Sequence, residues 1–353
     1  MSVYIIAEAG VNHNGDLDRA LSLVDVAAAA HADAVKFQTF DPEELVAPDA
    51  PKADYQAAAT GATESQLDML RRLALRQADF EIIRDQCRMR GIDFLSTPFD
   101  VASLDFLVDR LDMHSIKIAS GEIVNGPLLL RAARKRRRII LSTGMSTLDD
   151  IRIALSVIKY GRTNPSGYPS AVPDFPIKGD VDLAANVVLL HCTSEYPAPL
   201  DSVNLRAMAT LRDTFGLPCG FSDHSRGIAI PIAAAAMGAD IIEKHFTLDR
   251  SLPGPDHAAS LVPDELSDMV QGVRDVSRAL GTGEKKPTRA ETDTAAVARR
   301  VLVAAQEIAS GAKFTEANLA HRRATGGQSP MKYWRLLGHP AGRDYKRGDI
   351  IDE

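Results

Sequence analysis

Residues 220–227, GFSDHSRG, end a short apolar run with an aspartate and a histidine. Residues 241–250, IIEKHFTLDR, repeat the arrangement, because an apolar run leads there into Glu243, Lys244 and His245. Working outward from this pair, the chain shows a series of short apolar runs that end in polar residues or glycine, each typical of a buried β-strand. The eight runs are VYIIAEAG near residue 3, AVKFQT near 34, DFLSTPF near 93, SIKIASGE near 115, RIILSTGM near 138, NVVLLHCTSEYP near 186, PCGFSDHS near 218 and DIIEKHFT near 240.

Stretches with helical apolar spacing separate these runs, as in DRALSLVDVAAAAHAD (18–33) and QADFEIIRDQCRMRG (77–91). Strands that alternate with helices indicate βα units and a parallel sheet. Eight such units in about 250 residues predict a closed (β/α)8 TIM barrel. An open doubly wound sheet is the alternative, but no GxGxxG motif at a first βα turn supports it.

The chain divides into a large and a small part. We expect the barrel over residues 1–281 and a linker over 282–297, because residues 281–294, GTGEKKPTRAETDT, are polar and charged. Residues 298–353 then form a small, loop-rich domain that needs support from a neighbour. The Pro-, Gly- and Ser-rich stretch 160–180 is interpreted as an excursion between two βα units.

Composition excludes several classes of protein. The net charge of -6 over 353 residues leaves no basic footprint for nucleic acid. Three cysteines at unrelated spacings, Cys87, Cys192 and Cys219, form neither a disulfide framework nor a CxxC metal site. No run of about 18 apolar residues and no signal-peptide pattern at the start is present. We therefore expect a cytoplasmic protein without membrane or nucleic-acid partners.

The strand ends carry a dense group of reactive side chains, which should converge on the mouth of the barrel. Lys36 and Lys117 suit a phosphate monoester, since ammonium groups balance its charge and hydroxyl and loop amide groups satisfy its oxygens. Two alternatives remain: one lysine could form a Schiff base, and the hydroxyl groups could simply cap helices. The hydroxyl residues are Thr97, Ser120 and Ser142.

His224 and His245 should end adjacent strands, close enough to share one metal ion. Imidazoles in an open site suit a divalent ion such as Mn²⁺, and closed structural zinc is disfavoured because no cysteine pair accompanies them. Asp223 could orient His224 from behind. Glu8, at the end of the first strand, could be a general base or a salt-bridging carboxylate. A turn is sufficient to explain VNHNG (11–15).

These residues together resemble the sialic acid synthase family, whose members condense phosphoenolpyruvate with an N-acylated amino-sugar. The resemblance runs nearly end to end. It implies a barrel followed by an antifreeze-like (SAF) domain, and a homodimer in which that domain covers the partner's active site. The motifs are AEAGVNHNG, AVKFQTF, APKADYQ, ESQLDML, STPFD, KIASGE, LSTGM, HCTSEYPAP, GFSDHS, IEKHFTLDR and GPDHAAS.

By position, the resemblance implies that His224 and His245 bind Mn²⁺, or Mg²⁺ or Co²⁺, beside an essential Glu8. The small domain should offer Arg323 in preference to Arg322 to the sugar, although the usual Arg-Pro-Gly is replaced by RRATGG. Ser194 stands where an asparagine is frequent. The implied phosphoenolpyruvate site is Lys36, Thr97, Lys117, Ser120, Ser142, Ser194 and Ser222. The implied sugar site is Gln38, Glu122, Tyr196, Asp256 and Arg323.

The family's reaction joins phosphoenolpyruvate, the open-chain aldehyde of the sugar and water, and releases inorganic phosphate by C–O cleavage. We take N-acetylmannosamine, giving N-acetylneuraminate, as the acceptor. The alternative is 2,4-diacetamido-2,4,6-trideoxymannose, giving N,N'-diacetyllegionaminate, and a few pocket contacts would decide between them. Two rival functions are a Schiff-base lysine aldolase and a carbohydrate-binding scaffold without catalysis. So many reactive groups at one rim disfavour the scaffold.

Overall fold

The computed structural model describes residues 3–47, 50–52, 57 and 64–353. Residues 53–56 of the APKADYQ motif lie outside these described residues. The chain separates into two compact units, Met1–Gly281 and Thr282–Glu353, and each is described by itself.

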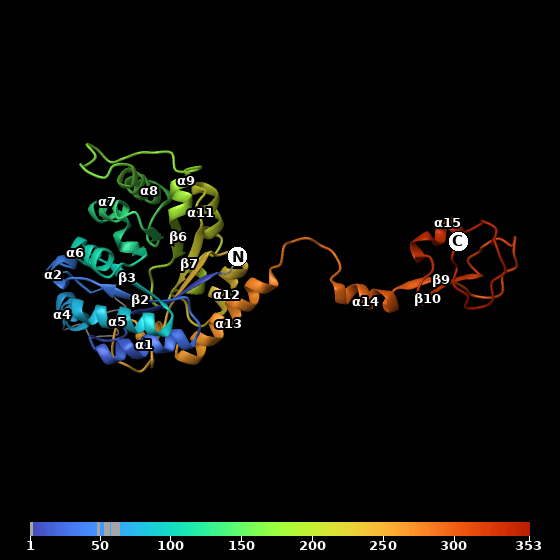
Figure 1. Ribbon diagram of the computed structural model, residues 1–353, viewed down its shortest axis with the longest axis horizontal. Coiled ribbons are helices and arrows are strands. Elements are labelled where there is room, and N and C mark those ends of the chain that lie inside the picture. The colour runs from blue at the N-terminus through green and yellow to red at the C-terminus, as the bar shows by residue number, and fades with distance from the viewer. Residues whose placement is uncertain (1–2, 48–49, 53–56, 58–63) are drawn as a thin grey trace. The chain divides into compact units, whose positions relative to one another are not determined.

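The first unit is an eight-stranded parallel barrel, as predicted, with helices around its strands (Figure 1). The hydrogen-bonded order is β3-β2-β1-β8-β7-β6-β5-β4, and the end strands β3 and β4 lie against each other where the barrel closes. Because this contact between β3 and β4 joins the two ends of the strand order, the open-sheet alternative is wrong. The strands are β1 (Tyr4–Gly10), β2 (Ala34–Thr39), β3 (Asp93–Pro98), β4 (Ser115–Ile118), β5 (Arg138–Ser142), β6 (Val187–Cys192), β7 (Cys219–Asp223) and β8 (Ile241–His245).

The helices begin and end where the local sequence satisfies their free backbone groups. The Asp16 side chain accepts a hydrogen bond from Arg19 N at the start of α1, and Gly91 ends α5 in the left-handed region at φ 70°. No helix among the described residues is long and apolar enough to cross a membrane. The helices of this unit are α1 (Leu17–Ala29), α2 (Pro42–Leu45), α4 (Gln66–Leu73), α5 (Gln77–Arg90), α6 (Val101–Asp105), η1 (Phe106–Arg110), η2 (Ser120–Val124), α7 (Gly126–Arg134), α8 (Leu148–Thr163), α9 (Val181–Asn186), α10 (Leu200–Val203), α11 (Ala207–Phe215), α12 (Ala229–Ala236), η3 (His257–Ala259) and α13 (Pro263–Ala279).

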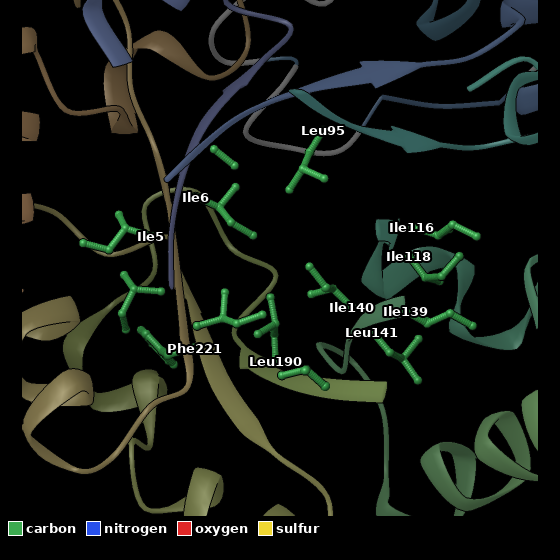
Figure 2. Packing of buried hydrophobic residues seen from close by; sticks show 14 of the residues in the cluster. Ile5, Ile6, Leu95, Ile116, Ile118, Ile139, Ile140, Leu141, Leu190 and Phe221 are labelled. Carbon is green, nitrogen blue, oxygen red and sulfur yellow. The ribbon is translucent and has the colours of Figure 1, made fainter. Parts of the chain in front are cut away.

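The barrel interior is filled by alternate residues of the strands. In Figure 2, Ile6, Leu95, Ile140 and Leu190 gather in the middle of the barrel, whereas the neighbouring residue Ile139 points away from it. Because the side-chain period of a strand is two, the residues two positions further on also face inward, at the carboxyl ends. An apolar floor thus lies beneath a polar mouth.

The second unit has its own small core around the antiparallel strands β9 (Arg300–Ala304) and β10 (Leu319–Arg323). It also contains α14 (Arg289–Ala298), η4 (Pro330–Lys332) and α15 (Tyr333–Leu336). All of helix α14 except its last residue, Ala298, falls within the stretch interpreted as linker, and Thr288 and Glu291 form the capping box that starts it. In the first unit, residues 164–180 of the Pro-, Gly- and Ser-rich stretch connect α8 to α9 without regular structure, whereas residues 160–163 are still part of α8.

Gly220 gives a stability prediction, because it faces the crowded interior of the barrel. A Cβ added there would lie 2.3 Å from the carbonyl oxygen of Ile241 and 2.8 Å from Leu190 Cδ2. We expect Gly220→Ala to lower the free energy of unfolding by about 1–3 kcal/mol, as measured by urea denaturation. Gly126→Ala is the control, since nothing lies within 4 Å of its added Cβ. Equal stability of the two variants would contradict the packing described.

Candidate active site

A cavity of about 500 Å³ lies at the carboxyl ends of the strands. Every site residue predicted in the barrel lines it, whereas Arg323 lies in the second unit, exposed at the end of β10. The structure therefore brings together side chains from all eight strand ends. The predicted residues that line the cavity are Glu8, Lys36, Gln38, Thr97, Lys117, Ser120, Glu122, Ser142, Ser194, Tyr196, Ser222, His224, His245 and Asp256.

The two lysines are buried and anchored by the hydroxyl groups beside them. Lys36 Nζ donates to Thr97 Oγ1 at 2.9 Å and forms an ion pair with Glu8 Oε2 at 2.6 Å. Lys117 Nζ donates to Ser142 Oγ at 2.7 Å. Thr97 and Ser142 thus contact lysines, while Asp100 and Thr147 are the residues that cap the following helices α6 and α8.

Glu243 lies between the two lysines, although it was not among the predicted site residues. Its Oε1 is 3.4 Å from Lys117 Nζ and accepts a hydrogen bond from Ser222 Oγ at 2.9 Å, while its Oε2 is 3.7 Å from Lys36 Nζ. Burial alone would raise its pKa, but Lys117 and Lys36 outweigh burial and lower the pKa to about 2. Period-two spacing from His245 is the signal that could have identified it.

The remaining charged groups of the cavity respond differently to burial. Burial raises the pKa of Glu8 to about 7, against the attraction of Lys36. Burial would lower the pKa of Lys36, but Glu243 and Glu8 raise it above its ordinary value. For Lys117 burial prevails, and its pKa is lowered. Near neutral pH the site therefore holds a carboxyl group that can exchange a proton beside fixed charges.

The two predicted metal ligands lie side by side, with ring centroids 5.5 Å apart. His224 Nδ1 donates to the carbonyl oxygen of Thr193 at 2.6 Å, which leaves the lone pair on Nε2. His245 Nδ1 is buried and has no hydrogen-bond partner among the described residues. Burial lowers the pKa of His224 to about 4 and that of His245 well below its ordinary value. Both rings are neutral near pH 7, which is the form that binds metals.

Among the described residues, few other side chains that could bind a metal ion lie near His224 and His245. No cluster of three or more His, Cys, Asp or Glu side chains suited to a metal ion is found in the part of the chain that the structure describes. The Tyr196 ring packs on His224, with centroids 4.1 Å apart. Asp256 Oδ2 is 4.0 Å from His245 Nδ1, and burial raises the pKa of Asp256 to about 6. An ion held by these imidazoles would leave most positions to water and substrate oxygens.

The structure contradicts the expected role of Asp223. Its Oδ2 accepts a hydrogen bond from Lys244 Nζ at 2.6 Å, and its Oδ1 accepts one from Ser225 N at 2.9 Å. The Nδ1 of His224 is held instead by a backbone carbonyl. Asp223 and Lys244 alternate with the inward residues of β7 and β8, so they form a fully buried ion pair between the strands and the surrounding helices.

Glycine permits the close approach of backbone to the hydroxyl group of Ser120. Gly144 N donates to Ser120 Oγ at 3.0 Å. A Cβ on Gly144 would lie 2.3 Å from Ser194 Oγ and 2.8 Å from Ser120 Oγ, so a side chain there would displace both hydroxyl groups. Cys192 Sγ also lies 3.0 Å from Ser120 Oγ. This corner of the cavity offers hydroxyl and backbone groups at the short range that an anion requires.

The turn VNHNG does more than reverse the chain. Asn12 Nδ2 donates to the carbonyl oxygen of Phe246 at 2.8 Å and to Ser260 Oγ at 3.0 Å. Ser260 Oγ in turn donates to the carbonyl oxygen of Asp256 at 2.7 Å. The turn thereby fixes both ends of the loop after β8, which carries Asp256.

One side of the cavity is apolar. A cluster of buried residues separate from the main barrel core packs there, around α4 and the loops that follow β1, β2 and β3. Every member of this cluster except Ala74 lines the cavity, and we call these lining residues the apolar wall. It consists of Val11, Phe40, Met69, Leu70 and Leu73 with the partly buried Leu45, Val46 and Phe99.

The fold and the cavity together define a (β/α)8 barrel protein with a buried site of two lysines, two carboxylates and two neutral histidines. A family model described as the NeuB family matches residues 23–285. The chain therefore belongs to the NeuB family.

Three relatives illustrate this membership. The chain is 44% identical, over 99% of its length and 98% of the relative, to the N,N'-diacetyllegionaminic acid synthase of Campylobacter jejuni. It is 43% identical, over 99% of its length and 94% of the relative, to the protein of that name from Legionella pneumophila. The crystal structure of the N-acetylneuraminic acid synthetase from Leptospira borgpetersenii in complex with citrate is 35% identical, with a TM-score of 0.69 over 83% of this chain and 90% of that one. The chain is thus a synthase of the nonulosonic acid type.

The buried pair behind the histidines gives a prediction on stability. Lys244→Met leaves the Asp223 carboxylate buried and uncompensated, so we expect the free energy of unfolding to fall by about 3–5 kcal/mol. The double variant Asp223→Asn/Lys244→Met removes that stranded charge and should recover much of the loss. Chemical denaturation of the three proteins measures both effects. A double variant no more stable than Lys244→Met would contradict the assigned pairing.

Proposed function

We propose that the protein is an N,N'-diacetyllegionaminate synthase, which condenses phosphoenolpyruvate, water and 2,4-diacetamido-2,4,6-trideoxymannose and releases inorganic phosphate. The observation that carries the condensation is the buried pair of lysines beside Glu8, Glu243 and two neutral imidazoles. The choice of acceptor is supported by the two relatives of that name at 44% and 43% identity. Their identity to this chain is higher than the 35% of the N-acetylneuraminic acid synthetase, whose name would support N-acetylmannosamine as the acceptor.

Phosphoenolpyruvate would bind deep in the cavity. Lys36 and Lys117 would neutralise its phosphate and carboxylate groups, with Thr97 and Ser142 holding the lysines in place. Ser120, Ser194 and the backbone near Gly144 would donate to its remaining oxygens. Such positioning of two reactants is worth up to about 7–11 kcal/mol of the barrier.

We propose Mn²⁺ as the cofactor, with Mg²⁺ and Co²⁺ as alternatives, held by His224 Nε2 and by His245. The orphaned Nδ1 of buried His245 and the lone pair on His224 fit such an ion. When bound, a divalent ion supplies Lewis-acid polarisation of the sugar's aldehyde. The neutral state of both rings favours this role at pH 7.

The reaction then follows from the placement of the reactants. The enol carbon of phosphoenolpyruvate attacks the aldehyde carbon, which leaves positive charge at the carbon that bears the phosphate. Water adds there, and the resulting tetrahedral intermediate expels inorganic phosphate by C–O cleavage. Glu8, with a pKa near neutrality, would accept or return the proton that this addition requires. Gln38, Glu122, Tyr196 and Asp256 would orient the sugar.

The second unit is assigned by resemblance. We propose a cytoplasmic homodimer in which this antifreeze-like unit covers the partner's cavity. Its Arg323, or alternatively Arg322, would contact the sugar. Both arginines are exposed on β10.

The test of the proposed function is phosphate release from phosphoenolpyruvate with Mn²⁺ and each sugar in turn. We expect faster release with 2,4-diacetamido-2,4,6-trideoxymannose than with N-acetylmannosamine, and loss of release with EDTA. The reverse order of the two sugars would make N-acetylneuraminate the product. Phosphate release that EDTA does not affect would contradict the proposed metal. Trapping of a lysine by borohydride would contradict the proposed synthase and favour a Schiff-base aldolase.

Lys117→Met tests the phosphoenolpyruvate site. The variant removes one charged donor at nearly constant volume, so we expect the KM for phosphoenolpyruvate to rise about 10- to 100-fold, the value of a charged hydrogen bond. The exposed Lys178→Met is the control. A variant that changes the KM of the sugar alone would refute this placement.

A further inference from the structure

The apolar wall is built next to the place where the sugar's aldehyde would be held. Residue Gly10 packs on the His245 ring, since a Cβ added to it would lie 3.4 Å from His245 Cε1. Val11, the first residue of the wall, follows directly, and β1 is the neighbour of β8 in the barrel. A sugar that extends from the two histidines towards the β1–β3 side therefore meets the wall.

The wall belongs to the cavity rather than to the core of the barrel. Its five buried members form a cluster of their own, and every one of them lines the cavity. Phe40 and Phe99 lock two of its loops together through an edge-to-face contact with centroids 6.2 Å apart. Met69 and Leu73 are 1% exposed, whereas Leu70 is 9% exposed and lines the cavity. The wall is thus a preformed apolar surface.

The two candidate sugars differ in how they would meet such a surface. N-acetylmannosamine carries hydroxyl groups at C4 and C6. The diacetamido sugar carries an acetamido group at C4 and a methyl group at C6. A hydroxyl group placed against the wall loses its hydrogen bonds to water without replacement, whereas a methyl group gains from burial.

We propose that the apolar wall is the specificity subsite of the enzyme, and that it receives the C6 methyl and the C4 acetamido methyl of the acceptor. This inference rests on the proposed function and adds the residues that select the sugar. Gln66 lies on the same helix as Leu70 and lines the cavity. Its amide can donate and accept, which matches the amide of the C4 substituent.

The expected size of the discrimination follows from the physics of apolar pockets. Such a pocket distinguishes substrates that differ by one small group by roughly 10- to 200-fold in kcat/KM. The wall should therefore set a preference of this size for the diacetamido sugar, and not an absolute barrier to N-acetylmannosamine.

The test uses Leu70→Asn in the full-length enzyme, with kcat/KM measured for both sugars. We expect the ratio of the diacetamido sugar to N-acetylmannosamine to fall at least about tenfold, with the KM for phosphoenolpyruvate unchanged. Leu70→Met, which stays apolar, should keep the ratio. Leu75→Asn is the matched control, because Leu75 packs against the main core and is not among the cavity-lining residues. Gln66→Met should lower kcat/KM for the diacetamido sugar alone.

The outcomes separate this inference from the proposed function. If the wild-type enzyme prefers the diacetamido sugar and Leu70→Asn leaves the ratio unchanged, the wall is not the subsite and the function stands. If the wild type turns over neither sugar, the proposed function fails. Saturation-transfer NMR on the diacetamido sugar then tests separately whether the apolar wall binds its C6 methyl group. Transfer to its C6 methyl in wild type but not in Leu70→Asn supports the subsite, and no difference between them overturns it.

Discussion

Four buried charges at the mouth of the barrel are the constraint on which the site depends. Lys36, Lys117, Glu8 and Glu243 lie on four different strands, and each would be costly to bury alone. Together they compensate one another, so the barrel must close in one register for any of them to be tolerated. The same closure brings the lysines and the carboxylates to within 2.6–3.7 Å of one another at the mouth of the cavity. Stability and chemistry are therefore imposed by one arrangement.

Because side chains alternate along a strand, neighbouring residues at the strand ends face either the cavity or the surrounding helices. On β8, Glu243 and His245 face the cavity, and Lys244 between them faces the helices. On β7, Ser222 faces the cavity and Asp223 faces outward, and His224, directly after the strand, again lines the cavity. The outward residues form an ion pair that joins the two strands behind the histidines. The motifs GFSDHSRG and IIEKHFTLDR thus supply both the residues that line the cavity and the ion pair behind them.

The fold was predictable because each strand is a short apolar run that ends in polar residues, and a helical pattern separates one run from the next. The gathering of predicted residues at one cavity follows from that fold, although their individual roles stay predictions. Glu243 was missed because the prediction rested on the histidine, and only the period of two shows that the residue two positions before His245 shares its inward face. The partner of His224 was wrongly predicted because a backbone carbonyl, Thr193, has no signature in sequence. The apolar wall was not foreseen because α4 and three loops combine only in space.

The separateness of the apolar wall has an evolutionary consequence. Its side chains contribute to a cluster distinct from the one that holds the barrel together. With the wall as the proposed subsite, substitutions at a few loop and helix positions would change the preferred sugar while the barrel core and the reactive groups on the strands stay unchanged.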